Sequence, residues 1–98
     1  MLSNTAISKL KADKPCVYVL LSLLDGNRYI GSTNNIIRRI KEHSNGKVIS
    51  TKRRRPLKLY AYQVFNDLAT ARLLEGKYKK SRGAFDKAIR DKKLIIIR

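Results

Sequence analysis

The chain has 98 residues, 43% of them hydrophobic, and its 23 lysines and arginines against 7 acidic residues give a formal net charge of +16. This length fits one compact domain and is too short for two well-packed ones. So large a positive charge opposes compaction by self-repulsion, which indicates a polyanionic partner, most commonly nucleic acid. A structural protein of a ribonucleoprotein particle would be equally basic, so charge alone predicts a partner but no chemistry.

Several classes of protein are excluded by what the sequence lacks. No apolar run reaches the roughly 18 residues needed to span a bilayer, and the N-terminus has no signal-peptide pattern. We therefore expect an intracellular protein, cytoplasmic and nucleoid-associated, with no membrane partner. Cys16 is the single cysteine, so no internal disulfide can form, and no cysteine and histidine cluster has zinc-site spacing.

The chain divides into an N-terminal extension and one domain. Residues 1–14 read as the extension, with a short helix at residues 5–12, and the domain is expected over residues 15–98. No internal repeat and no linker long enough to separate two domains interrupts this range.

Two strands joined by a hairpin open the domain. Residues 16–23 (CVYVLLSL) are almost continuously apolar, as in a central strand covered on both faces. The Asp25-Gly26 pair is a strong hairpin signal, and residues 27–31 (NRYIG) read as the returning strand. A two-residue turn sets Tyr29 opposite Ser22, which places Tyr18 and Tyr29 on the same face.

A helix follows at residues 36–43 (IIRRIKEH), after Ser32 to Asn35 supply capping residues, and it begins at Asn34 or Asn35. At about 100° per residue its three isoleucines form one apolar arc, and Arg39 and His43 lie together on the shoulder of that arc. They are an i, i+4 pair at the margin of the core, where a side chain can face the sheet. The plain alternative is a snorkelling arginine and an ordinary boundary histidine.

Residues 52–56 (KRRRP) read as a basic loop, and Lys52, Arg53, Arg54 and Arg55 are candidates for contact with nucleic-acid phosphates. Residues 57–65 then form a third strand with Tyr60 and Tyr62 on one face.

The next helix, residues 68–80, carries a carboxylate inside its apolar stripe. Glu75 lies between the directions of Leu68 and Ala71, and an unpaired carboxylate is costly to bury there. It therefore needs a cation, which is either a basic side chain, such as Lys79 at i+4, or a metal. Because Glu75 is the only good metal candidate, a two-metal phosphodiesterase is disfavoured, and any metal would be one hard divalent ion with mostly water ligands, as Mg²⁺ prefers.

The end of the chain is expected to form one more helix, residues 81–93, capped by Ser81. Residues 94–98 (LIIIR) then read as a strand or an apolar tail. Lys79 and Lys80, at the end of the preceding helix, join the candidates for nucleic-acid contact.

These elements resemble the ordered motifs of the GIY-YIG nuclease superfamily: CVY at residues 16–18, YIG at residues 29–31, then Arg39, His43 and Glu75. The similarity covers roughly residues 15–90 and is greatest to the small stand-alone bacterial members. It implies an α+β fold, a small three-stranded antiparallel sheet flanked by helices. It also implies a metal-dependent endonuclease that cleaves phosphodiester bonds in DNA with one ion, Mg²⁺ or Mn²⁺.

The resemblance further implies a catalytic role for each of the five residues. Tyr18 or Tyr29, with Tyr18 preferred, would help to deprotonate the attacking water, with Arg39 and the metal favouring its phenolate, while the other tyrosine orients water or phosphate. Arg39 would hold the scissile phosphate and stabilise its growing charge, and His43 would hydrogen-bond a tyrosine or a phosphate. Glu75 would bind the metal. A lone domain would need a second copy or a partner protein to cut both strands.

The sequence departs from the motif where Cys16 replaces the first glycine. The alternative function is a non-catalytic, basic nucleic-acid-binding protein of the same fold, in which the lysines and arginines grip phosphate and no cut follows. The two functions differ in cleavage and not in binding.

Overall fold

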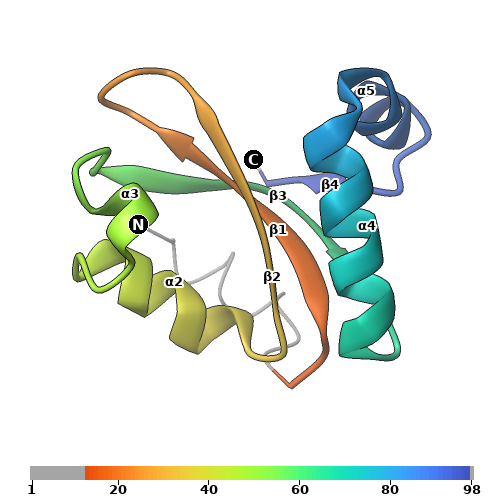
Figure 1. Cartoon of the computed structure of the whole chain (residues 1–98), viewed down its shortest axis with the longest axis horizontal. Coiled ribbons are helices and arrows are strands. Elements are labelled where there is room, and N and C mark those ends of the chain that lie inside the picture. The colour runs from red at the N-terminus through yellow and green to blue at the C-terminus, as the bar shows by residue number, and fades with distance from the viewer. Residues whose placement is uncertain (1–12, 98) are drawn as a thin grey trace.

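The computed structural model describes residues 13–97. The helix predicted at residues 5–12 lies outside this range. Four antiparallel strands form one sheet in the order β2-β1-β3-β4 (Figure 1). The strands are β1 (Cys16–Ser22), β2 (Arg28–Thr33), β3 (Leu57–Val64) and β4 (Ile95–Ile96).

The predicted α+β class is confirmed, but the sheet has one strand more than the three expected. β4 is a two-residue strand that pairs with the middle of β3. The final apolar run, which the sequence left open between a strand and a tail, therefore begins as a strand at the far edge of the sheet.

Helices cover both faces of this sheet: α2 (Ile36–Ser44), α3 (Ile49–Lys52), α4 (Leu68–Lys80) and α5 (Arg82–Arg90) (Figure 1). Asn35, Asp67 and Ser81 cap α2, α4 and α5, each accepting a hydrogen bond from the backbone N–H three residues further on. The short α3 was not predicted, because four residues are too few to show helical periodicity. It ends at Lys52, the first residue of the segment expected to be a basic loop.

Two apolar clusters lie on opposite faces of β1, because successive side chains of a strand alternate. Tyr18 and Leu20 pack with the isoleucines of α2 on one face, and Val17 and Val19 pack with α4 and α5 on the other. A strand buried on both faces is what the continuous apolar run predicts. No helix within residues 13–97 combines the length and apolar character that crossing a membrane requires.

The hairpin between β1 and β2 has a longer loop than predicted. Tyr29 pairs with Leu20 and not with Ser22, and Ser22 N–H donates to the carbonyl of Asn27 at 2.9 Å across a four-residue connection. The predicted register was wrong by two residues. A shift of two preserves the face of every side chain, so Tyr18 and Tyr29 do lie on the same face.

A β-bulge in β3 separates two tyrosines that were predicted to share a face. Val19 pairs with Ala61 and Leu20 with Leu59, which leaves Tyr60 without a partner in the ladder. The extra residue turns Tyr60 toward the α4–α5 face, while Tyr62 packs on the α2 face. That prediction was therefore wrong.

Candidate active site

The tyrosines of β1 and β2 meet the arginine and histidine of α2 on one face of the sheet. The Tyr18 and Tyr29 ring centroids are 6.3 Å apart, and the His43 ring lies 5.6 Å from the first and 5.2 Å from the second. Arg39 Nε donates to Tyr18 Oη at 3.4 Å. Four of the five residues selected from the sequence therefore form one cluster.

His43 lies deeper than the helix pattern indicated. It was placed at the margin of the core, but the structure buries it completely, at 0% exposure. Its Nε2 is 2.8 Å from Tyr18 Oη, and its Nδ1 is 2.7 Å from Thr51 Oγ1. Thr51 belongs to α3 and was missed, because nothing in its local sequence distinguishes it from a loop residue.

The donors and acceptors of this cluster balance for a neutral imidazole. When Nδ1 carries the proton, it donates to Thr51, whose hydroxyl can donate to the Val48 carbonyl at 3.5 Å. Nε2 then accepts the proton of the Tyr18 hydroxyl, which itself accepts from Arg39. The chain of hydrogen bonds runs from the guanidinium through the phenol to the imidazole.

Burial governs the ionisation of both groups. Desolvation, reinforced by the positive charge of Arg39, lowers the pKa of His43 from 6.5 to about 4. Desolvation also raises the pKa of Tyr18, against the smaller lowering effect of its hydrogen bond with Arg39. Arg39 therefore does not produce a phenolate here by itself, and the Tyr18 hydroxyl stays protonated.

Gly31 allows the Tyr18 ring to lie against β2. The two residues are direct partners in the ladder, and a Cβ at position 31 would lie 2.6 Å from Cζ and from Oη of Tyr18. Contact with the tyrosine of the CVY motif therefore requires glycine at the third position of the YIG motif.

Arg39 has one side turned to solvent. Its Nη1 lies 3.3 Å from Glu42 Oε1, and its side chain is 34% exposed. Glu42, which the helix pattern directs to solvent, thus accompanies the guanidinium at its open side. An exposed ion pair of this kind contributes little to stability, so a phosphate can replace it at low cost.

Glu75 of α4 reaches β2, the edge strand that carries Tyr29, from the other face of the sheet. Ser32 of β2 donates to its Oε1, and Lys79 Nζ lies 2.5 Å from its Oε2. Lys79 also lies 5.9 Å from the centroid of the Tyr29 ring, which joins the two parts of the site around β2. Ser32 had been assigned to the helix cap, although strand alternation from Tyr29 places it on the α4 side.

The carboxylate of Glu75 fits a singly held magnesium ion in its chemistry. Within residues 13–97 no group of three or more histidine, cysteine, aspartate or glutamate side chains could hold a metal. Mg²⁺ accepts one carboxylate when water and substrate phosphate supply the other oxygens. Lys79, the i+4 partner that the sequence offered as the alternative to a metal, pairs with Oε2, so a metal there would have to displace its ammonium group.

The predicted basic loop is only partly available for nucleic acid. Lys52 and Arg53 are exposed. Arg54 pairs with Asp25 at 3.3 Å, and Arg55 donates to the Ser44 and Lys52 carbonyls, where α2 and α3 end. These two arginines have structural partners. Lys80, at the end of α4, is exposed.

Cys16 fills the core at the position of the motif glycine. It is 2% exposed and packs with Tyr18 and the α2 isoleucines. Burial raises the pKa of its thiol to about 12, so the thiolate that would act as a nucleophile or metal ligand does not form near neutral pH. The larger side chain thus acts as an apolar packing residue.

Comparison with known proteins agrees with this geometry. Residues 14–88, a range that includes all five candidate site residues, match the family model described as the GIY-YIG catalytic domain. A UPF0213 protein of Bacillus licheniformis is 37% identical over 78 residues, which cover 78% of this chain and 80% of that protein. A UPF0213 protein of Bacillus pumilus is 33% identical over 63 residues, 63% and 64% of the two chains. No solved structure matches the chain.

The matched range contains the two tyrosine motifs in adjacent strands, the arginine and histidine one helical turn apart, and the glutamate that reaches β2 from α4, so this chain belongs to the GIY-YIG catalytic domain family.

Proposed function

We propose that the chain is a metal-dependent DNA endonuclease whose site consists of Tyr18, Tyr29, Arg39, His43 and Glu75. One observation carries the proposal: a hydrogen-bonded chain runs from a partly exposed guanidinium through a phenol to a neutral imidazole. The Glu75 carboxylate stands on the other side of β2, paired with Lys79, which lies 5.9 Å from the centroid of the Tyr29 ring. An anion site, a proton path and a metal ligand are the parts that phosphodiester hydrolysis requires.

Arg39 binds the scissile phosphate in this mechanism. Its fork matches two phosphate oxygens, and the charge that grows on them during attack strengthens the contact. Tyr29 is half-buried beside Tyr18 and orients the phosphate or the attacking water. Bound at Glu75, a divalent ion such as Mg²⁺ or Mn²⁺ would polarise the phosphate and stabilise the leaving oxygen.

Tyr18 and His43 act together as the base. Water gives a proton to Tyr18 Oη as the Tyr18 proton passes to His43 Nε2, and the resulting hydroxide attacks phosphorus while the leaving oxygen departs and takes a proton from solvent. His43 is a weak base in the free protein because burial and, to a smaller extent, the charge of Arg39 lower its pKa. A phosphate anion on Arg39 offsets that charge, so substrate binding itself raises the basicity of the imidazole.

Cleavage of supercoiled plasmid and of branched oligonucleotides tests the proposal, with Mg²⁺ or Mn²⁺ compared with EDTA. We expect metal-dependent cutting that Glu75→Gln and Arg39→Ala abolish. Asp91→Asn is the matched control, because it removes a carboxylate at the C-terminal end of α5 that pairs with Lys87, outside the site. It should cut like the wild type.

Binding distinguishes the alternative function. Glu75→Gln should bind DNA as tightly as the wild type or slightly more tightly, because it removes a negative charge beside the phosphate path. A wild type that binds DNA in a salt-sensitive way but cuts none of these substrates would refute the nuclease and favour the non-catalytic binding protein.

A further inference from the structure

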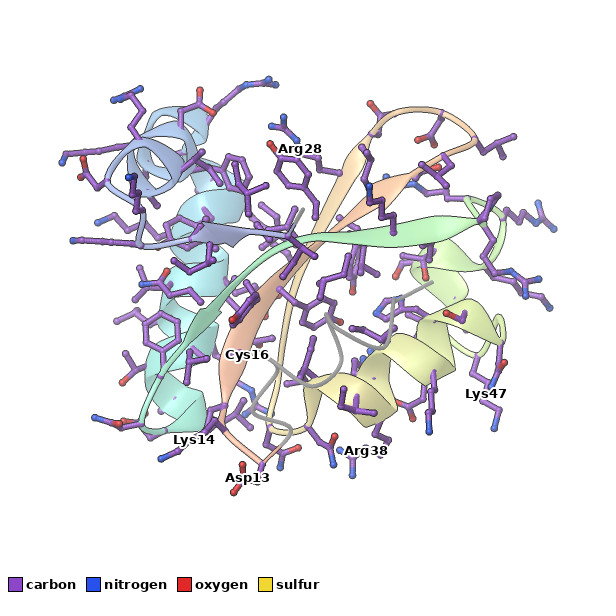
Figure 2. The ribbon with its side chains drawn as sticks, turned by 180° about the vertical axis from the view of Figure 1, so that it is seen from behind. Asp13, Lys14, Cys16, Arg28, Arg38 and Lys47 are labelled. Carbon is purple, nitrogen blue, oxygen red and sulfur yellow. The ribbon has the colours of Figure 1, made fainter. Side chains whose placement is uncertain are left out.

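A groove of about 370 Å³ runs from the candidate active site along the α4–α5 side of β2. Tyr29 and Lys79, which also belong to the candidate active site, line this groove together with Arg28, Arg82 and Phe85. Figure 2 shows Arg28 between the β1–β2 hairpin and α5. A nucleic-acid strand held at Arg39 and Glu75 can therefore extend into this groove without leaving the surface of β2.

Arg28 is held in place by aromatic rings. Its guanidinium carbon lies 5.0 Å from the centroid of the Tyr60 ring and 5.4 Å from that of Phe85. The bulge in β3 creates this arrangement, because it turns Tyr60 to the α4–α5 face. Rings beneath the guanidinium orient its plane and leave its N–H groups for a ligand.

The cations of the groove differ in their partners. Lys79 pairs with Glu75 at 2.5 Å, and Arg82 lies 4.0 Å from Asp86. The ion pairs found within residues 13–97 do not include Arg28. It is therefore the groove cation whose charge is offset by no neighbouring carboxylate in the described part of the chain.

We propose that Arg28 binds a phosphate of the DNA backbone that flanks the scissile phosphate. A planar guanidinium with unpaired donors suits phosphate oxygens. A stacked base is the poorer occupant, because Arg28 already covers the Tyr60 and Phe85 rings. The proposal rests on the proposed function only in taking DNA as the ligand, since it concerns binding and not cutting.

Nuclear magnetic resonance in EDTA, where a metal-dependent cut cannot occur, localises the contact. We titrate ¹⁵N-labelled protein with a short oligodeoxynucleotide and follow the arginine Nε–Hε signals. The Arg28 signal should shift and saturate with the DNA, whereas that of Arg90, an exposed arginine at the end of α5, should not. An Arg28 signal that stays unchanged while backbone amides of the site shift would overturn the proposal.

Salt dependence provides the second measurement. Arg28→Ala should weaken DNA binding and reduce the slope of log Kd against log salt by about 1, the value for one lost phosphate contact. Arg28→Lys keeps the charge and should keep the slope while it loses part of the affinity. Arg90→Ala is the matched control and should leave the slope unchanged, and equal slopes for Arg28→Ala and Arg90→Ala would overturn the proposal.

The two proposals fail in different ways. If the wild type cuts DNA but the Arg28 variants and signals show no such effects, the nuclease proposal stands and the groove contact is refuted. If the Arg28 effects appear but the wild type cuts no DNA, the groove contact stands and the nuclease proposal is refuted.

Discussion

Lowering the pH should destabilise this protein through His43 in particular. The folded state holds the imidazole neutral at 0% exposure, with its pKa lowered to about 4, while the unfolded chain returns it to about 6.5. Between these two values the unfolded state binds more protons, so stability present above pH 6.5 is lost as the pH falls toward 4.

The size of this loss follows from the interval between the two pKa values. At about 1.4 kcal/mol per pH unit, one histidine contributes roughly 3 kcal/mol of unfolding free energy across the interval. Small domains have only about 5–15 kcal/mol in total. Protonation of this one side chain should therefore remove a substantial part of the stability of the fold.

Urea unfolding followed by circular dichroism at several pH values from 7 to 4 measures the effect. His43→Gln has no group that titrates at this position. Its unfolding free energy should be lower than that of the wild type at pH 7 and should then fall less than that of the wild type as the pH is lowered. Subtracting the two series removes the carboxylates, which titrate in both proteins. A constant difference between them from pH 7 to 4 would refute the assignment of a buried neutral histidine.

A second variant identifies the cause of the lowered pKa. Tyr18→Phe removes the hydroxyl that meets Nε2 but leaves the imidazole covered. Because burial is the leading cause, this variant should keep most of the pH dependence. A pH dependence that disappears with the hydroxyl would show that the hydrogen bond is responsible.

Three further substitutions test the geometry of the site. Gly31→Ala places a Cβ 2.6 Å from the Tyr18 ring and should cost about 1–3 kcal/mol in urea unfolding; an unchanged midpoint would contradict the close packing. Gly76→Ala meets nothing within 4 Å inside α4 and should instead stabilise by about 1 kcal/mol, measured in the same way. Lys79→Met frees Glu75 Oε2 from an exposed i, i+4 pair and should tighten Mn²⁺ binding about twofold in calorimetry, since such pairs contribute about 0.3–0.5 kcal/mol. That gain should vanish when Glu75→Gln is added, and weaker binding by Lys79→Met would count against metal binding at this carboxylate.

Periodicity accounts for most of what could be predicted. The apolar run at residues 16–23 identified the central strand, and the spacing of Leu68, Ala71 and Tyr78 identified the buried side of α4, because alternation and helical repeat follow directly from backbone geometry. The caps at Asn35 and Ser81 were also predictable, because a short polar side chain just before an apolar helix is a local signal.

Features that depend on contacts between distant segments were not predictable. The bulge at Tyr60 arises where β3 pairs with β1, and neither strand alone shows it. Thr51 became a partner of His43 only because α3 folds back over α2. The same holds for Arg28, which appeared as an ordinary strand residue until the fold placed the Tyr60 and Phe85 rings beneath it.

The sequence by itself determined which residue types are available for chemistry and their order along the chain: two tyrosines on one strand face, an arginine and a histidine one helical turn apart, and a carboxylate in an apolar stripe. Only the tertiary structure decided their ionisation and their partners. Burial keeps His43 neutral and the Tyr18 hydroxyl protonated, and the approach of α4 to the edge of β2 gives Glu75 both Ser32 and Lys79. The physical reason is that desolvation and charge pairing depend on what surrounds a side chain in space, whereas helical and strand periodicity depend only on its neighbours along the chain.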